Sequence, residues 1–186
     1  MNPNRRLVLN AGAALGAAAL MGDALAQPPA NYLDAPAPGK PGDFHFLHGN
    51  WTIRHQRLLK PGEWDRFDGE ASCFTILGGV TSVEELRIPA RDFSGMGLRT
   101  LDMTTKVWSD YWMNAKSGVL GSEGVKGGFV NGDGVFITDE TEDGKPIKVI
   151  GLWDKITASG CRWRQGVSRD GGNTWDYNWI MDWTRA

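Results

Sequence analysis

Residues 44–59, FHFLHGNWTIRHQRLL, have the pattern of an opening β-strand whose two faces differ in character. A strand sends alternate side chains to opposite sides of a sheet, so residues two apart share one face. Gly49 allows the chain to bend sharply as it enters the strand. We therefore expect one set to point inward, namely Trp51, Ile53, His55 and Arg57.

Residues 175–185, WDYNWIMDWTR, carry a second alternating pattern at the far end of the chain. If this strand runs antiparallel to the first, Arg185 returns beside Trp51, and His55 lies across from Met181. A guanidinium in that position can stack on the indole of Trp51. The side chains that share one parity in this strand are Trp175, Tyr177, Trp179, Met181, Trp183 and Arg185.

Short β-type runs fill the chain between these ends, without a helical period of useful length. Asn131-Gly132 and Asp143-Gly144 supply the positive φ angles that tight hairpins need. Ten runs with hairpin-length links predict an all-β fold, a ten-stranded antiparallel up-and-down β-barrel, because an even count lets the first and last strands pair. A β-sandwich, the structural alternative, needs longer connections. The expected strands are 51–59, 67–77, 81–88, 95–102, 107–114, 119–130, 134–141, 146–154, 160–168 and 174–185.

Three segments resemble a known group of proteins: FLHGNWTIRHQRLL at 46–59, WSDYW at 108–112 and SRDGGNTWDYNWIMDWTR at 168–185. They are similar to bacterial calycin-like domains of no settled function, related in shape to nitrobindins and fatty-acid-binding proteins. The resemblance runs from Phe44 to Arg185. It implies that Gly49, Trp51 and Arg185 close the barrel. The residues Phe44, Phe46 and Leu47 are expected to form a short helical turn across the closed end. It implies little about activity.

The first 26 residues have the features of a secretory signal peptide. Arg5-Arg6 precedes an Ala/Gly/Leu run, and Ala24-Leu25-Ala26 forms a cleavage site, in a pattern close to that of twin-arginine signals. The apolar run is shorter than the roughly 20 residues of a spanning helix, so we expect no stable membrane insertion. The sequence therefore predicts a periplasmic or secreted protein.

Residues 27–42 contain five prolines, which favour an extended leader, and the barrel domain is expected over residues 43–186. Removal of the signal takes away Arg5, Arg6 and Asp23, leaving 18 basic and 21 acidic residues and a charge of -3. This mildly acidic surface does not carry the basic stripe that nucleic acid needs. The oligomeric state stays open.

Cys73 and Cys161 are the two cysteines of the chain. In the expected topology they lie on the second and ninth strands, three gaps of about 4.8 Å apart, which gives roughly 14 Å. Bridged Cα atoms lie within ~7 Å of each other, so we expect two buried, reduced thiols.

His55 and Arg57 are the polar residues of the inward set, and Arg57 is expected across from Trp179. Together they could orient the polar end of a ligand or supply acid–base chemistry. The alternative is a histidine that only hydrogen-bonds within a polar core.

Nine tryptophans are more than core packing usually requires. Trp163, Trp175, Trp179 and Trp183 are expected on the inward faces of the last two strands, where they would line a cavity for a flat or apolar molecule. The alternative is a barrel packed solid with indoles. Trp108 and Trp112 belong to the same candidate ligand-binding set.

Carboxylates in the middle strands are the candidates for catalysis. Residues 107–114 present either Trp108, Asp110 and Trp112 or Ser109 and Tyr111 to the interior, and the sequence does not decide between the two faces. One of Glu84 and Glu85 must also face inward, where Arg87 or Arg99 could pair with it. A carboxylate buried among indoles has a raised pKa, so an isomerase or hydrolase using His55 with Asp110 or Glu84 is the alternative function.

Residues 168–175, SRDGGNTW, fit the Asp-box pattern of sialidase propellers. One box in so short a domain cannot build a propeller, so Ser168 and Asp170 are expected to stabilise a hairpin turn. All three histidines lie between 45 and 55, which disfavours a metal site or a haem site with a late axial histidine. We expect no cofactor.

The sequence thus favours an exported β-barrel that binds a small apolar or aromatic molecule. A second alternative is a packed envelope protein that acts through its surface.

Overall fold

The computed structural model describes residues 30–33 and 37–186. The expected signal peptide, residues 1–26, lies outside the described residues, as do residues 27–29 and 34–36 of the expected leader. None of the helices in the described part of the chain is long and apolar enough to cross a membrane.

The described residues form ten strands and four short 3-10 turns. The turns are η1 (Ala30–Leu33), η2 (His45–Leu47), η3 (Leu77–Gly79) and η4 (Pro89–Arg91). The strands are β1 (Gly49–Lys60), β2 (Glu63–Ile76), β3 (Thr81–Ile88), β4 (Phe93–Leu101), β5 (Trp108–Asn114), β6 (Val125–Val130), β7 (Asp133–Glu142), β8 (Lys145–Asp154), β9 (Gly160–Ser168) and β10 (Asp176–Arg185).

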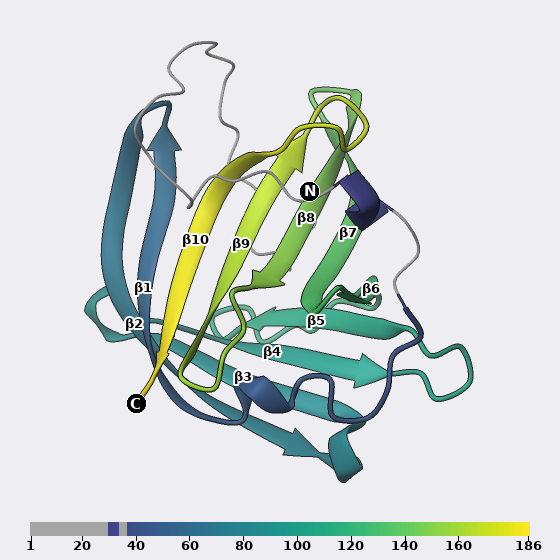
Figure 1. Ribbon diagram of the computed structural model, residues 1–186. Helices are drawn as coiled ribbons and strands as arrows, with labels where there is room; N and C mark the ends of the chain where they lie inside the picture. The colour runs from purple at the N-terminus through teal and green to yellow at the C-terminus, as the bar shows by residue number, and fades with distance from the viewer. Residues whose placement is uncertain (1–29, 34–36) are drawn as a thin grey trace.

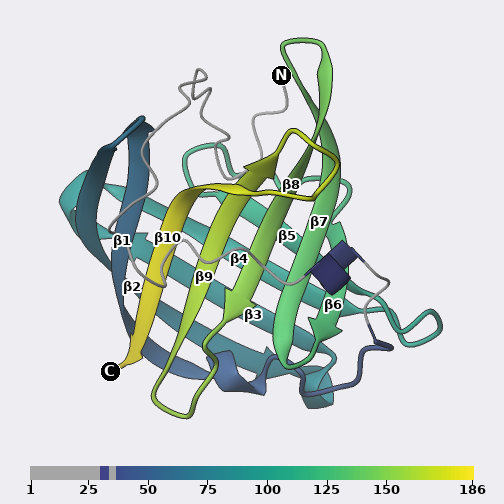
Figure 2. The ribbon, with the colours of Figure 1, turned by 45° about the horizontal axis from the view of Figure 1, so that its top comes forward.

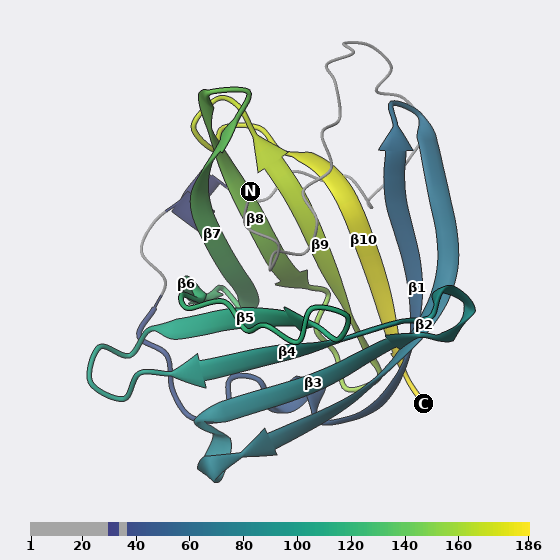
Figure 3. The ribbon, with the colours of Figure 1, turned by 180° about the vertical axis from the view of Figure 1, so that it is seen from behind.

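Each strand pairs antiparallel with the next along the chain, and β10 pairs with β1 to close the barrel. The predicted ten-stranded up-and-down β-barrel is therefore confirmed. Figures 1 and 3 show β7 to β10 standing beside β1, with β3, β4 and β5 crossing beneath them.

The register of the closing pair is also as predicted. Trp51 lies opposite Arg185, His55 opposite Met181, and Arg57 opposite Trp179. This agreement follows from the two-residue period of a strand, since a slip by one residue would turn every inward side chain outward.

Arg185 fastens the closed end of the barrel. Its Cζ lies 4.3 Å from the ring centroid of Trp51, and its guanidinium donates hydrogen bonds to the carbonyl oxygens of His48 (2.7 Å) and Phe46 (3.0 Å). Gly49 has φ of 123°, and an added Cβ would lie 2.7 Å from Nη1 of Arg185. Glycine is therefore needed at position 49 for both the bend and the close approach.

The largest hydrophobic cluster fills the barrel interior toward this closed end. The ring of Phe44 packs edge-on against Trp108, with centroids 4.9 Å apart, and Trp153 packs against Trp183 at 5.4 Å. Trp108, Asp110 and Trp112 form the inward face of β5, because Trp108 and Trp112 both pack with this cluster.

A second cluster lies on the outer side of the sheet and includes Trp175. Val135 and Phe136 are neighbours on β7 but belong to different clusters, which places the two clusters on opposite faces. The expectation that Trp175 shares the inward face of Trp179 is wrong, because the register shifts between Tyr177 and Trp179. One extra residue in a strand reverses its parity.

The 3-10 turn η1 covers this outer cluster, on the outer side of β7 in Figures 1 and 2. Tyr32 is 5% exposed and donates a hydrogen bond to the Asp133 carboxylate. The Asp-box turn that precedes β10 is structural, as predicted: Oγ of Ser168 accepts a hydrogen bond from the Gly172 amide (2.7 Å), and Asp170 accepts one from the Thr174 amide (2.9 Å).

Cys73 and Cys161 are both free and buried, which confirms the predicted absence of a disulfide. Burial and the negative charge of Glu84 raise the pKa of each thiol above its ordinary value. A thiol rather than a thiolate is a poor nucleophile.

We therefore expect neither cysteine of the folded protein to react with an aromatic disulfide reagent at mildly alkaline pH. The same titration in denaturant should release two thiols per chain. Rapid modification of the native protein would contradict the buried placement.

The wall is weakest where β5 meets β6. These strands pair at only three positions, Trp108 with Gly127, Ser109 with Lys126 and Asp110 with Val125, against eleven positions for β1 and β2. The sixth strand begins at Val125 instead of the expected position 119, so residues 115–124 form a loop beside this seam.

Candidate functional site

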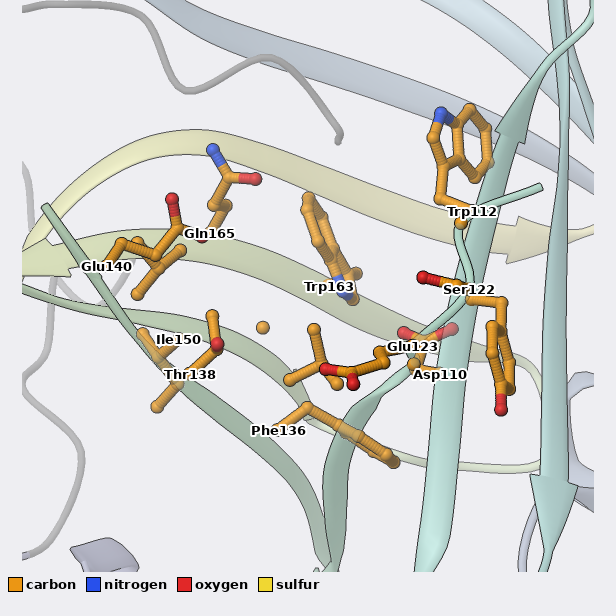
Figure 4. A pocket seen from close by; sticks show the side chains of 16 residues that line it. Asp110, Trp112, Ser122, Glu123, Phe136, Thr138, Glu140, Ile150, Trp163 and Gln165 are labelled. Atoms are coloured by element: carbon orange, nitrogen blue, oxygen red, sulfur yellow. The ribbon is translucent and has the colours of Figure 1, made fainter. Parts of the chain in front are cut away.

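A cavity of about 270 Å³, partly open to solvent, lies inside the barrel wall formed by β5, β7, β8 and β9. The end of the loop before β6 completes it, and Figure 4 shows the labelled side chains converging on this space. The lining residues are Asp110, Tyr111, Trp112, Gly121, Ser122, Glu123, Gly124, Val125, Phe136, Thr138, Glu140, Val149, Ile150, Gly151, Trp163 and Gln165.

The apolar part of the lining includes the aromatic side chains of Trp112, Phe136 and Trp163. Trp112 and Phe136 each lie over a glycine of the neighbouring strand. A Cβ on Gly95 would lie 2.3 Å from the Trp112 ring, and one on Gly127 would lie 2.6 Å from the Phe136 ring. The missing side chains let these rings lie against the backbone, which leaves room beside them.

Gly151 differs from those glycines because an added Cβ there would make no close contact. It pairs with Gln165 of β9, and an added Cβ would lie 3.5 Å from Nε1 of Trp163, an ordinary contact distance. The cavity therefore owes part of its volume to the lack of a side chain at position 151.

The polar part of the lining includes three carboxylates besides uncharged groups. Asp110 and Glu140 are half-buried, and Glu123 is exposed on the loop. In Figure 4, Asp110 and Glu123 lie on the side of β5 and the loop, while Glu140 lies on the opposite side. Gln165 is buried and donates a hydrogen bond to Asn178 (3.0 Å).

A buried ion-pair network connects the cavity to the closed end. Nη2 of Arg99 lies 2.6 Å from Oε2 of Glu84, and Nε of Arg99 lies 3.5 Å from Oδ1 of Asp110. The Arg99 and Glu84 side chains are both 0% exposed. Burial alone would lower the pKa of Arg99, but the charges of Glu84 and Asp110 outweigh it, so the pKa is raised. Gly97 makes room for this pair, since a Cβ there would lie 3.0 Å from Nη2 of Arg99.

His55 is held in a different environment. Its ring stacks on Phe67 with centroids 4.6 Å apart, and its Nδ1 accepts a hydrogen bond from Nε1 of Trp179 (3.2 Å). The Arg57 guanidinium lies 5.3 Å from the Trp179 ring, and burial together with the nearby Arg91 lowers the pKa of Arg57. A Cβ on Gly69 would lie 2.6 Å from Nε2 of His55.

The structure separates the candidate site residues into two groups. Asp110, Trp112 and Trp163 line the cavity. The others lie elsewhere. Glu84 pairs with Arg99, Trp108 lies at the closed end, and Trp175 belongs to the outer cluster. His55, Arg57 and Trp179 lie together on β1 and β10.

An isomerase or hydrolase using His55 would need a carboxylate that orients its ring. The contacts of His55, Glu84 and Asp110 instead favour a structural role for these side chains. Both candidate carboxylates, Glu84 and Asp110, lie against Arg99, and Nδ1 of His55 is directed to an indole.

Sequence reasoning missed several lining residues, among them Phe136, Thr138, Glu140, Glu123 and Gln165. Three of these alternate along β7, and the period of a strand would have placed Phe136, Thr138 and Glu140 on one face. Glu123 gave no such signal, because the loop that carries it was assigned to a strand.

Within residues 30–33 and 37–186, no group of three or more His, Cys, Asp or Glu side chains is placed to hold a metal ion. Together the fold and the site define a closed antiparallel β-barrel with an internal aromatic and acidic cavity. This shape is consistent with the calycin-like resemblance of its sequence motifs. No protein-family model matches the chain, and no curated protein shows significant similarity to it.

Proposed function

We propose that this protein binds a small organic molecule with a flat or apolar body in the cavity between β5, β7, β8 and β9. The observation that carries the proposal is the aromatic wall of Trp112, Phe136 and Trp163 around an open space in the barrel interior. Ligand pockets are typically concave and largely apolar, with a few polar groups that fix orientation. A barrel that acted only through its surface would have no need of such a space.

The size of the cavity favours a small ligand. Its volume of about 270 Å³ lies just below the roughly 300–1,000 Å³ typical of ligand sites, which suits a molecule of one or two rings. The signal-like features at Arg5-Arg6 and Ala24-Leu25-Ala26 support a role outside the cytoplasm. The proposal is therefore an exported binding protein for a small ring-bearing molecule.

We expect Gly151→Leu to weaken binding of one- and two-ring compounds at least about tenfold, because the leucine side chain would occupy the cavity next to Trp163. Phenethyl alcohol and naphthol are suitable first probes, with quenching of tryptophan emission and titration calorimetry as the two measurements. Trp163 lines the cavity, so a bound ring should alter its emission directly.

Thr141→Leu is the matched control, since Thr141 is exposed and alternates with the inward-facing Glu140 on β7. It places the same leucine side chain on the outer face of the wall and should leave binding unchanged. Equal affinities of the Gly151→Leu and parent proteins would place the binding site elsewhere, and no response from any probe would contradict a binding function.

A further inference from the structure

We infer that Arg57 forms a second ligand site, which binds the carboxylate of a small organic acid at the inner wall of the barrel. This site lies beside the cavity, and it goes beyond the proposed function without depending on it. Three observations support the assignment: the position of Arg57 on the wall, the charges around it, and the lack of a hydrogen-bond acceptor for it among the described residues.

Arg57 lies on the inner face of β1, close to the cavity wall. It pairs with Trp179 of β10, and Trp179 pairs in turn with Gln165 of β9, which lines the cavity. Neighbouring strands are about 4.8 Å apart, so the backbone of Arg57 lies roughly 10 Å along the wall from that of Gln165. Figure 2 shows β9, β10 and β1 side by side. An acid bound at Arg57 would therefore be near the cavity but outside it.

The Arg57 guanidinium is half-buried and has no acceptor for its hydrogen bonds. Within residues 30–33 and 37–186 it forms neither a hydrogen bond nor an ion pair, and its Cζ lies over the Trp179 ring, 5.3 Å from the centroid. A guanidinium carries five N–H donors, and donors that are withdrawn from water without a partner lower the stability of the fold. A bound oxyanion would accept hydrogen bonds from these donors.

The carboxylate opposite Arg57 is engaged by another guanidinium. Asp65 faces Arg57 across the β1–β2 pair, but both of its oxygens pair with Arg91, at 2.7 Å from Nη1 to Oδ2 and 2.8 Å from Nη2 to Oδ1. Arg91 also lies over the Phe67 ring, 3.5 Å from its centroid. Two guanidinium groups and one carboxylate give this group of side chains a net charge of +1.

The surroundings of Arg57 disfavour its charge when no ligand is bound. Burial, and then the positive charge of Arg91, lower the pKa of Arg57, and the opposing effect of Asp65 is smaller. A ligand carboxylate would supply both a countercharge and two oxygens that match the fork of the guanidinium. The net charge of +1 also suits a monoanion better than a phosphate dianion.

Arg57→Met removes the charge and the donors and keeps an unbranched side chain beside Trp179. We expect it to weaken the binding of hexanoate at least about tenfold in titration calorimetry at neutral pH, and to leave the binding of hexanol unchanged. Inorganic phosphate is the third probe and should bind the parent protein more weakly than hexanoate.

Arg54→Met is the matched control. Arg54 is exposed and alternates with the inward-facing Ile53 and His55 on the same strand. The substitution therefore removes the same charge from the outer face of β1, and it should leave hexanoate binding unchanged.

The stability of Arg57→Met distinguishes a ligand site from an arginine that the fold requires. Since Arg57 has no hydrogen-bond acceptor in the described part of the chain, its replacement should keep or raise the midpoint of urea unfolding in the absence of ligand. A clearly lower midpoint would assign Arg57 a structural role and overturn the inference.

Gly151→Leu tests whether the two sites are separate. It should leave hexanoate binding unchanged, because the added side chain lies in the cavity and Arg57 lies outside it. Hexanoate binding that is lost in Gly151→Leu and kept in Arg57→Met would overturn the inference and leave the cavity function intact. Equal effects of Arg57→Met and Arg54→Met, or tighter binding of phosphate than of hexanoate, would also overturn it. If hexanoate does not bind the parent protein, the inference fails, whatever the ring compounds do.

Discussion

Arg99→Met is expected to lower the free energy of unfolding by about 3–5 kcal/mol. The substitution keeps a long apolar side chain beside Phe44 and Trp153, whose ring centroids lie 5.5 and 5.2 Å from the guanidinium carbon. It leaves Glu84 in the barrel interior without its cation, and the Glu84 side chain is 0% exposed. A buried carboxylate that loses its countercharge must either remain charged at high cost or take up a proton.

A urea titration measures this loss, with Arg87→Met as the control. Arg87 lies on the neighbouring strand β3 and pairs with Glu85 and Glu70, but these groups are partly or largely exposed. Exposed ion pairs contribute about 0–1 kcal/mol to stability. Adding Glu84→Gln to Arg99→Met should recover part of the stability, because it removes the stranded charge. Similar urea midpoints for the Arg99→Met and parent proteins would show that this ion pair is not buried as described.

Arg185→Ala is expected to cost roughly 1–3 kcal/mol, although chain ends usually fray and tolerate change. The guanidinium stacks on Trp51 and donates hydrogen bonds to the carbonyl oxygens of Phe46, His48 and Ala158. Its loss leaves these carbonyl groups to water and uncovers the indole at the closed end.

Denaturant titration again provides the measurement, and Thr184→Ala is the control one residue earlier. Thr184 is exposed on the opposite face of β10, so its change should have little effect. Parent-like stability of Arg185→Ala would mean that the closed end is held by other contacts.

The fold could be predicted because strand alternation and turn glycines are local signals. The Trp51 and Arg185 pairing followed once both end strands were recognised, since an antiparallel register then fixes every other partner. The free cysteines followed from the same topology. The β3 strand begins and ends where the sequence placed it, from Thr81 to Ile88.

Two features of the strands escaped prediction: a register shift in β10 and the start of β6. The register shift after Tyr177 depends on how β10 meets β9, and no residue type in WDYNW marks it. Val119 and Leu120 were assigned to a strand as apolar residues, but they are exposed in the loop before β6. Apolar character alone does not distinguish a strand residue from an exposed loop residue.

The site was predicted only in part for a similar reason. Facing inward is a local property, whereas an empty space depends on which small residues lie opposite, such as Gly151 beside Trp163. The sequence emphasised His55 and Arg57, which the fold packs against Phe67 and Trp179. The carboxylates of the cavity come from three separate segments that only the closed barrel brings together.

The short seam between β5 and β6 has a consequence for the kinetics of this protein. Only three residue pairs join the strands, and the loop that follows β5 also lines the cavity. Local opening at this seam breaks few hydrogen bonds, so it is far more frequent than global unfolding. The cavity is already partly open to solvent, and opening of this seam would widen the path by which a solute exchanges with it.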